Sequence, residues 1–366
     1  MSQSDSCDQD LNERLWADFC DHLKRVGNQV MRPEVPRDAR TRAEGLRYLT
    51  HVLRSSLDIF VDHADPEFPV LYRPCDEIVK YGGDNPDSYY QKAALSGDKR
   101  YRIKGKRGTI PYLSFLTQGT TFSEDKTMVS TGFLDGSSLQ IDPDGSFEII
   151  VSVDESPGNW LPMKPETQAL LIRQNFEDRS RERIAELEIE CLDAPERPRP
   201  LDPVLFEQGL RSSVQFVEST VELFCDWAEK FQKHPNQLPE DDQEGCQKVG
   251  GDPNICYHNS YWELAEDEAL VVELERIPEC ESWNFEVCNY WYQSLDYRYQ
   301  RVHVNKSTAR YEDDGSVRIV IAHEDPGHPN WLTTEGHPCG VMLFRWIGAE
   351  EHLEPTTRVV KIDALR

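Results

Sequence analysis

Apolar residues recur at helical spacing in three stretches of the chain, residues 11–30, 46–61 and 210–231. Spacings of three and four residues place such side chains on one face of a helix, so we expect three amphipathic helices. Capping residues mark two of the expected starts: Thr41 with Glu44 as a capping box, and Asp202 with Pro203 as a cap and first turn.

Most of the remaining sequence alternates between apolar and polar residues, as half-buried β-strands do. Tyr101 and Ile103 alternate with basic residues. Phe147, Ile149 and Val151 alternate in the same way behind the turn sequence DPDGS. Together with the three helical stretches, this pattern predicts a mainly β protein with flanking helices, in the α+β class.

The chain also repeats itself. The stretch DGSFEIIVSVDESPGNWL at 144–161 returns at 314–332 as DGSVRIVIAHEDPGHPNWL. Offsets of 170 to 172 residues align several further positions: Gly145 with Gly315, Trp160 with Trp331, Tyr112 with Trp283, Tyr101-x-Ile103 with Val272-x-Leu274, and Arg173 with Arg345. So many matches in one order indicate an internal duplication, in which each copy is a helix followed by a β-sandwich.

The duplication suggests a domain organisation. We expect an N-terminal helix at 1–37, a first helix-plus-sandwich copy at 38–192 and a proline-rich joint at 193–202. The second copy would then occupy 203–366 and include an exposed acidic loop at 235–256.

Several strings are similar to those of bacterial proteins catalogued as domain of unknown function 1214: NPDSYY, YRIKGKRG, PGNWLPM, LLIRQNF, DGSVRIVIAHEDPGHPNWL and PTTRVVKI. The resemblance covers most of the chain from about Arg42 onward and is weakest in the acidic loop. It implies two jelly-roll-like β-sandwich halves with flanking helices. It implies no activity, because the family has none assigned.

Charge narrows the possible partners. The chain has 66 acidic and 40 basic residues, a formal net charge of −26 and a pI near 4.8. Such a charge repels nucleic acid and anionic membranes, so we expect neither as a partner. The polar N-terminus does not resemble a signal peptide, no apolar run approaches the length of a membrane span, and the ten cysteines form no CxxC pair. We therefore expect a cytoplasmic protein.

The second copy carries titratable residues that the first lacks. His323 stands where the first copy has Val153, His328 is part of an insertion, and His337 follows soon after. Imidazoles and carboxylates such as Asp325 are ligands for a divalent transition metal and act as acids and bases. Our candidate catalytic residues are His323, His328 and Asp325, and our candidate metal ligands are His323, His328 and His337. The alternative is a polar surface loop.

Other candidates point to ligand binding. Tyr89 and Tyr90 follow a glycine-rich turn, and Tyr290 and Tyr292 lie in an aromatic-rich stretch. Arg345 lies within an apolar run, where a buried guanidinium needs an acidic partner or a bound anion. For the tyrosines the alternative is core packing, and for Arg345 it is a structural ion pair.

These features favour a protein that binds or processes a small polar or amphipathic organic molecule. The chemistry would be acid/base or metal-assisted hydrolysis or elimination. The sequence has no GxSxG, P-loop or GxGxxG motif, which argues against the common serine hydrolases, NTPases and dinucleotide enzymes. The alternative is a non-catalytic β-sandwich interaction module.

Overall fold

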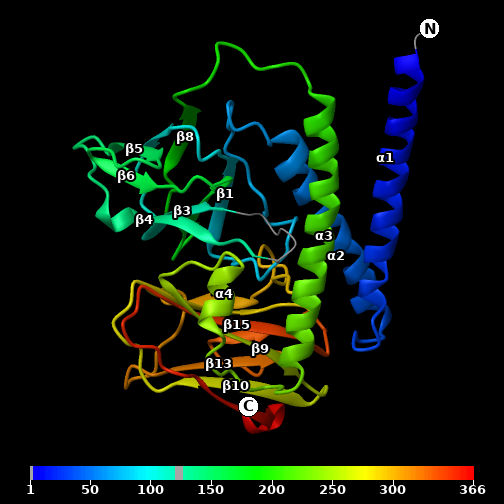
Figure 1. Cartoon of the computed structure of the whole chain (residues 1–366). Coiled ribbons are helices and arrows are strands. Elements are labelled where there is room, and N and C mark those ends of the chain that lie inside the picture. Colours follow the sequence, from blue (N-terminus) through cyan, green and yellow to red (C-terminus); the bar gives the residue numbers. More distant parts are fainter. Residues whose placement is uncertain (1–2, 120–126) are drawn as a thin grey trace.

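The computed structural model describes residues 3–119 and 127–366, with side chains from residue 14 onward (Figure 1). Two β-sandwiches are stacked on one another, and α3 (Pro203–Phe231) runs past both of them. The other helices are α1 (Gln3–Gly27), α2 (Ala39–Leu57) and α4 (Gln243–Lys248). Short helical turns lie at Gln29–Met31, Asp58–Asp62, Gly136–Ser138 and Ile362–Ala364.

The helix caps agree in part with the sequence. Asp202 caps α3 as expected, because its carboxylate accepts hydrogen bonds from the backbone N–H groups of the first turn. The prediction of a capping box formed by Thr41 and Glu44 at the start of α2 is wrong. The cap is Asp38, whose side chain accepts from the Thr41 N–H at 2.9 Å, so Thr41 and Glu44 lie inside the helix.

The first sandwich contains two sheets. One has the order β1-β7-β3-β4 and the other β6-β5-β2-β8. The strands of the first sheet are β1 (Ser88–Ala94), β7 (Ala169–Asn175), β3 (Tyr112–Gln118) and β4 (Ser130–Asp135). Those of the second are β6 (Asn159–Pro162), β5 (Ser146–Ser152), β2 (Tyr101–Lys106) and β8 (Glu186–Cys191).

The second sandwich repeats this topology. Its sheets have the orders β9-β15-β11-β12 and β14-β13-β10-β16. The first sheet contains β9 (Ile255–Glu263), β15 (Cys339–Ile347), β11 (Ser282–Val287) and β12 (His303–Asn305). The second contains β14 (Trp331–Thr333), β13 (Val317–Ala322), β10 (Glu268–Leu274) and β16 (Thr356–Lys361). The matching strand orders confirm that the fold consists of two duplicated β-sandwich halves with flanking helices.

The strand register corrects the sequence alignment in β3 and β11. Arg173 lies opposite Ser114, and Arg345 lies opposite Asn284. With the two arginines equivalent, Leu113 rather than Tyr112 matches Trp283. A slip of one residue exchanges the two faces of a strand. Leu113 accordingly points into its sandwich core as Trp283 does, while Tyr112 points toward the other half.

A second correction concerns β2 and β10. Ile103 pairs with Ile149 and Val272 pairs with Ile319, so Tyr101-x-Ile103 matches Leu270-x-Val272. This shift of two residues keeps the same face buried, because side chains in a strand alternate with a period of two.

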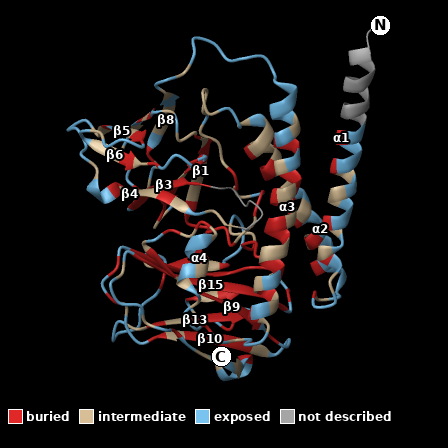
Figure 2. Cartoon of the chain, in the orientation of Figure 1, coloured by how far each residue is buried: buried red, intermediate tan, exposed pale blue. Residues whose placement is uncertain are grey.

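Each half has its own apolar core between its two sheets. The helices form a third cluster with the second half, in which Tyr48 of α2 stacks on Trp291 and Phe224 of α3 contacts Tyr292. Figure 2 shows that the strands are largely buried and that the side of α3 facing the sandwiches is buried too. Among the helices that the structure describes, none has the length and apolarity needed to cross a membrane.

The segment 235–256 differs from the expected exposed loop. It contains α4 and leads directly into β9, and several of its side chains are buried. Asp252 is 0% exposed and Leu238 is 2% exposed. Of its carboxylates, Asp252 binds groups inside the protein, as described below, and Glu240, Asp242 and Glu244 are exposed.

Candidate functional site

A cavity of about 180 Å³ lies where the two halves meet. Strands β1 and β7 of the first half, β9 and β15 of the second, and helix α3 contribute to its wall. The lining residues used below are Gly83, Asp84, Tyr90, Lys92, Gln118, Leu171, Arg173, Phe224, Trp227, Gly250, Tyr257, Asn259, Tyr292, Leu343 and Arg345. The cavity therefore belongs to neither half alone.

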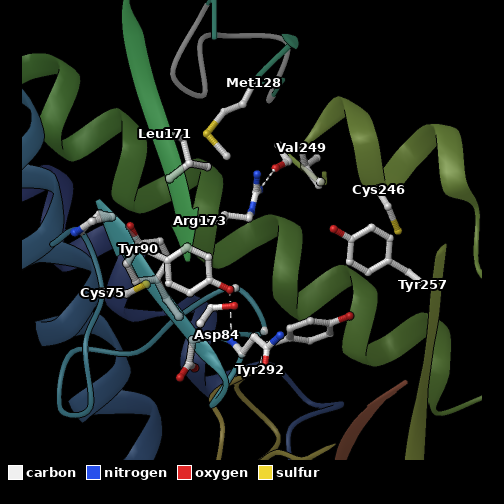
Figure 3. Close-up of a pocket in the computed structure, with 18 of the residues that line it drawn as sticks. Cys75, Asp84, Tyr90, Met128, Leu171, Arg173, Cys246, Val249, Tyr257 and Tyr292 are labelled. Atoms are coloured by element: carbon white, nitrogen blue, oxygen red, sulfur yellow. Dashed lines mark hydrogen bonds between the residues drawn. The ribbon is translucent and has the colours of Figure 1, made fainter. Parts of the chain in front are cut away.

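Two Gly-Gly-Asp loops, residues 82–84 and 250–252, reach across between the halves. Arg345 of the second half donates a hydrogen bond to the carbonyl of Gly83 at 2.7 Å. Arg173 of the first half donates to the carbonyl of Gly250, as Figure 3 shows. These loops have equivalent places in the duplication, and the repeated Gly-Gly-Asp string is a sequence signal by which they could be identified.

The aspartates of these loops bind the opposite half as well. Asp84 accepts hydrogen bonds from the N–H and hydroxyl of Ser294 at 3.1 and 2.7 Å. Asp252 accepts from the hydroxyl groups of Tyr112 and Ser114 at 3.0 and 2.8 Å. Each half therefore holds the loop of the other, and this exchange fixes the shape of the cavity.

Each half also places a tyrosine beside its arginine. Tyr90 lies opposite Arg173 in the register of β1 and β7, and Tyr257 lies opposite Arg345 in the register of β9 and β15. Figure 3 shows Tyr90, Arg173, Tyr257 and Tyr292 around the same space. The duplication has thus produced two similar polar pairs that face one cavity.

Both arginines have an acidic partner from a neighbouring element. Burial alone lowers the pKa of Arg345, but the Glu286 carboxylate, at 2.6 Å, more than offsets that effect. Burial also acts to lower the pKa of Arg173, but the Asp252 carboxylate, 3.5 Å from the guanidinium, raises it above the ordinary value. Both guanidinium groups are therefore charged at neutral pH.

Several donor groups on the cavity wall lack an acceptor within the described part of the chain. They are Nε2 of Gln118 and the hydroxyl of Tyr292, both buried, and Nη1 of Arg173, which is 3.5 Å from the Asp252 carboxylate but forms no hydrogen bond. A buried donor without a partner costs about 1–3 kcal/mol. A ligand rich in acceptor oxygens would satisfy these groups.

Two residues of the cavity have a pKa moved toward neutrality by burial. Burial lowers the pKa of Lys92 to about 8, and no carboxylate offsets it. Burial also raises the pKa of Asp84 to about 7, although Lys80 and the Ser294 hydrogen bonds oppose this shift. Groups that titrate near neutral pH inside a cavity are suited to acid/base chemistry.

The rest of the wall is apolar and aromatic. Phe224 and Trp227 of α3 lie beside Tyr292, with ring centroids 5.1 and 6.0 Å from it. Leu171 and Leu343 contribute aliphatic surface from β7 and β15. The cavity thus combines cationic groups with a surface for an apolar ligand body, a common composition for small-molecule sites.

Three of the five predicted ligand-binding residues, Arg345, Tyr90 and Tyr292, line this cavity. The other two do not. Tyr89 points to the opposite face of β1, where the Arg73 guanidinium lies 4.4 Å from its ring centroid. Tyr290 packs against Trp291 at 5.1 Å, under α2 and α3.

The predicted histidine cluster lies elsewhere. His323 follows β13, in the outer sheet of the second half, and its Nδ1 is 2.7 Å from the hydroxyl of Thr334. His337 is buried, with Nε2 2.7 Å from Glu44 of α2 and Nδ1 2.8 Å from the carbonyl of Thr334. His337 therefore joins helix and sandwich through an ion pair.

The two remaining residues of the predicted catalytic group stabilise a turn. Nδ1 of His328 accepts a hydrogen bond from the Asn330 N–H at 3.1 Å, and burial lowers the pKa of His328. Asp325 accepts from the Gly327 N–H at 2.7 Å. Neither side chain lines the cavity.

The structure also corrects the predicted metal site. His323 and His337 both contact Thr334, through its hydroxyl and its carbonyl, whereas His328 is hydrogen-bonded to the Asn330 N–H. Over residues 14–119 and 127–366, no group of three or more histidine, cysteine, aspartate or glutamate side chains has an arrangement that could hold a metal ion.

Comparison with known proteins agrees with the duplicated fold. The family model described as Protein of unknown function (DUF1214) matches residues 87–174 and 263–351, one region in each half. The crystal structure of an uncharacterised protein from Burkholderia cenocepacia is 49% identical, with a TM-score of 0.95 over 97% of this chain and 98% of that one. No curated protein matches the chain.

A more distant structure shares the fold alone. The VPA0106 protein from Vibrio parahaemolyticus is 11% identical, with a TM-score of 0.50 over 86% of this chain and 98% of that one. None of these descriptions names a ligand or a reaction, so the cavity itself is the basis for a functional proposal.

Proposed function

The chain belongs to the DUF1214 family of proteins of unknown function, and we propose that it binds a small organic anion with an apolar body in the cavity between its halves. The observation that carries the proposal is the gathering of Lys92, Arg173 and Arg345 around one cavity in a chain of net charge −26. Buried cations cost free energy unless they are paired. Arg345 and Arg173 are paired with Glu286 and Asp252, so a bound anion would supply the counter-charge that Lys92 lacks.

The size and surface of the cavity suit such a ligand. A cavity of about 150 Å³ is large enough for benzene, and this one encloses about 180 Å³. The aromatic wall of Phe224, Trp227 and Tyr292 would contact the apolar body. The donor groups without acceptors would hydrogen-bond to a carboxylate, which offers several lone pairs.

The same cavity supports acid/base processing of the ligand. Lys92 and Asp84 titrate closest to neutral pH among the cavity groups with a resolved pKa. They replace the histidines of the second copy as the residues to test for hydrolysis or elimination.

Calorimetric titration with phenylacetate tests the proposal, with the uncharged phenylacetamide as the comparison ligand. We expect binding of phenylacetate, weaker binding of the amide, and an affinity for phenylacetate that falls about tenfold or more in Arg173→Met, since a hydrogen bond to a charged group contributes about 1.5–3 kcal/mol. His323→Ala is the matched control because His323 lies outside the cavity. Equal binding of the acid and the amide, or loss of binding in His323→Ala alone, would contradict the proposal.

A further inference from the structure

Lys92 occupies a distinctive place in the cavity. On β1 it lies two residues from Tyr90 and therefore on the same face, and it pairs with Leu171, while Tyr90 pairs with Arg173. All four residues line the cavity. Lys92 and Arg173 are thus diagonal neighbours across two strands, about 7–8 Å apart at the backbone. Their long side chains can reach opposite ends of one small ligand.

The Lys92 amine has no partner in the described part of the chain. The residue is 5% exposed, yet no hydrogen bond or ion pair of its side chain occurs among residues 14–119 and 127–366. Lys80 provides the contrast. It is 7% exposed, and its ammonium donates to the carbonyls of Ser294 and Leu295, both at 2.9 Å.

The duplication shows that this lysine is specific to one half. Lys92 pairs with Leu171 and Asn259 pairs with Leu343, so the second half has an amide where the first has an amine. The tyrosine and the arginine, by contrast, are present in both halves. A structural requirement common to the two sheets therefore does not explain Lys92.

Burial makes this amine a nucleophile near neutral pH. With a pKa of about 8, close to half of the Lys92 side chains are uncharged at pH 8, whereas an ordinary lysine is almost entirely protonated there. An uncharged lysine in an apolar pocket is the form that attacks carbonyl carbon.

We propose that Lys92 forms an imine with the carbonyl group of a small oxo acid whose carboxylate is bound by the cavity arginines. The amine lone pair attacks the carbonyl carbon, the C–N bond forms as the C=O π bond breaks, and one proton passes from the nitrogen to the oxygen to give a carbinolamine. The hydroxyl group then leaves as water with a proton from an acid in the cavity, the nitrogen lone pair forms the C=N bond, and the remaining N–H proton returns to the conjugate base of that acid. Asp84, which also lines the cavity, would be that acid.

This inference rests on the proposed function, because the carboxylate must be bound before the carbonyl can reach Lys92. The test uses the full chain, phenylpyruvate as the oxo acid and sodium borohydride, which reduces an imine to a stable secondary amine. We expect one adduct per chain, with the mass of the ligand less one oxygen atom, on the peptide that carries Lys92. We also expect excess phenylacetate, which has the carboxylate but no ketone, to suppress the adduct.

Two variants make the result specific. In Lys92→Met the adduct should fall to background, and phenylacetate should bind more weakly than to the parent, because Arg173 and Arg345 remain but one cavity cation is lost. Lys104→Met is the control, because the side chain of Lys104 is 55% exposed on the outer sheet of the first half, and its adduct yield should equal that of the parent.

The outcomes separate the two proposals. Binding of both acids without an adduct on Lys92 would overturn the imine and leave anion binding in place. Failure of both acids to bind would overturn the proposed function. An adduct that persists in Lys92→Met would show reaction at other lysines and would also overturn the imine.

Discussion

At the scale of single residues, Lys92 and His337 show how a partner decides the effect of burial on a basic group. Burial lowers the pKa of Lys92, and no carboxylate offsets it. Burial also acts to lower the pKa of His337, but its hydrogen bond and ion pair with Glu44 reverse the effect, and the pKa is raised. The two residues should therefore give opposite dependences of stability on pH.

For Lys92 the prediction is a stability that rises with pH. Its folded-state pKa of about 8 lies below the ordinary 10.5, so between these values the unfolded chain binds more protons and the free energy of unfolding increases with pH. Lys92→Met lacks this dependence and should be more stable than the parent near pH 7, by up to about 3 kcal/mol. The difference should shrink toward pH 10.5. Urea unfolding at several pH values measures it, and parallel pH profiles would contradict it.

For His337 we expect the stability to fall with rising pH instead. Its raised pKa means that the stabilising contribution is fully present below pH 6.5 and is lost as the pH rises through the folded-state value. His337→Gln should therefore be more destabilising at acidic pH than at alkaline pH. Glu44→Gln should show the same dependence, because it removes the other partner of the pair. A loss that is constant with pH in either variant would contradict the ion pair.

At the scale of elements, the Gly-Gly-Asp loops shape the cavity. Gly83 has φ +66°, a conformation that L side chains rarely adopt. A Cβ atom there would lie 2.7 Å from the ring of Tyr292 and 2.8 Å from Leu343, so the loop, the aromatic wall and β15 meet at this glycine.

Gly83→Ala should therefore combine backbone strain with a steric clash. We expect the free energy of unfolding to fall by about 1–2 kcal/mol because of the left-handed conformation and by about 1–3 kcal/mol because of the clash. Phenylacetate should also bind more weakly. Gly158→Ala is the matched control, since Gly158 has φ +82° but nothing within 4 Å of the added methyl group. Thermal unfolding of both variants measures the difference. Equal destabilisation would show that the close packing around Gly83 has little effect.

At the scale of the whole molecule, polar contacts join the two halves. Asp87 of the first half is 5% exposed and accepts hydrogen bonds from the amides of Asn284 and Asn305 of the second, at 3.1 and 3.0 Å. Nε2 of His303 lies 3.2 Å from the same carboxylate. With the exchanged Gly-Gly-Asp loops and α3 beside both sandwiches, these contacts should make the halves unfold as one unit.

Calorimetry should accordingly show a single transition for the parent chain. Asp87→Ala removes one of two acceptors from each amide, since Asn284 also donates to Asn85 and Asn305 to the Glu177 carbonyl. The loss of these two hydrogen bonds should lower the stability of both halves, by about 0.5–1.5 kcal/mol each. Asp154→Ala is the control, because Asp154 is exposed and surface substitutions of this kind change stability by about 0.5 kcal/mol or less. Two separate transitions in the parent would contradict the coupling.

Much of the fold could be predicted from the sequence, because helical periodicity, strand alternation and the repeat are local patterns. The exact register of the strands could not be predicted in this way. The alignment of Tyr112 with Trp283 was one residue off because both Tyr112 and Leu113 are apolar enough to occupy a core. Only the strand pairing of Arg173 and Arg345 shows which of the two faces the sandwich core.

The site was predicted only in part for a related reason. Arg345, Tyr90 and Tyr292 were identified from residue type, but alternation along a strand does not tell whether the polar face meets solvent or another sheet. Lys92 and Arg173 lie on faces that the opposite half covers, and the partner loops come from distant sequence. The histidines were conspicuous in the sequence, yet their rings have local partners away from the cavity.

The most direct test of anion binding is a crystal structure of the complex with para-bromophenylacetate, in which the anomalous signal of bromine locates the ligand. We expect a bromine peak beside Phe224 and Trp227, with the carboxylate toward Arg173 and Arg345 and its oxygens accepting hydrogen bonds from the free donors of the wall. A bromine peak outside this cavity, for example beside His323, or a cavity without ligand at saturating concentration, would contradict it.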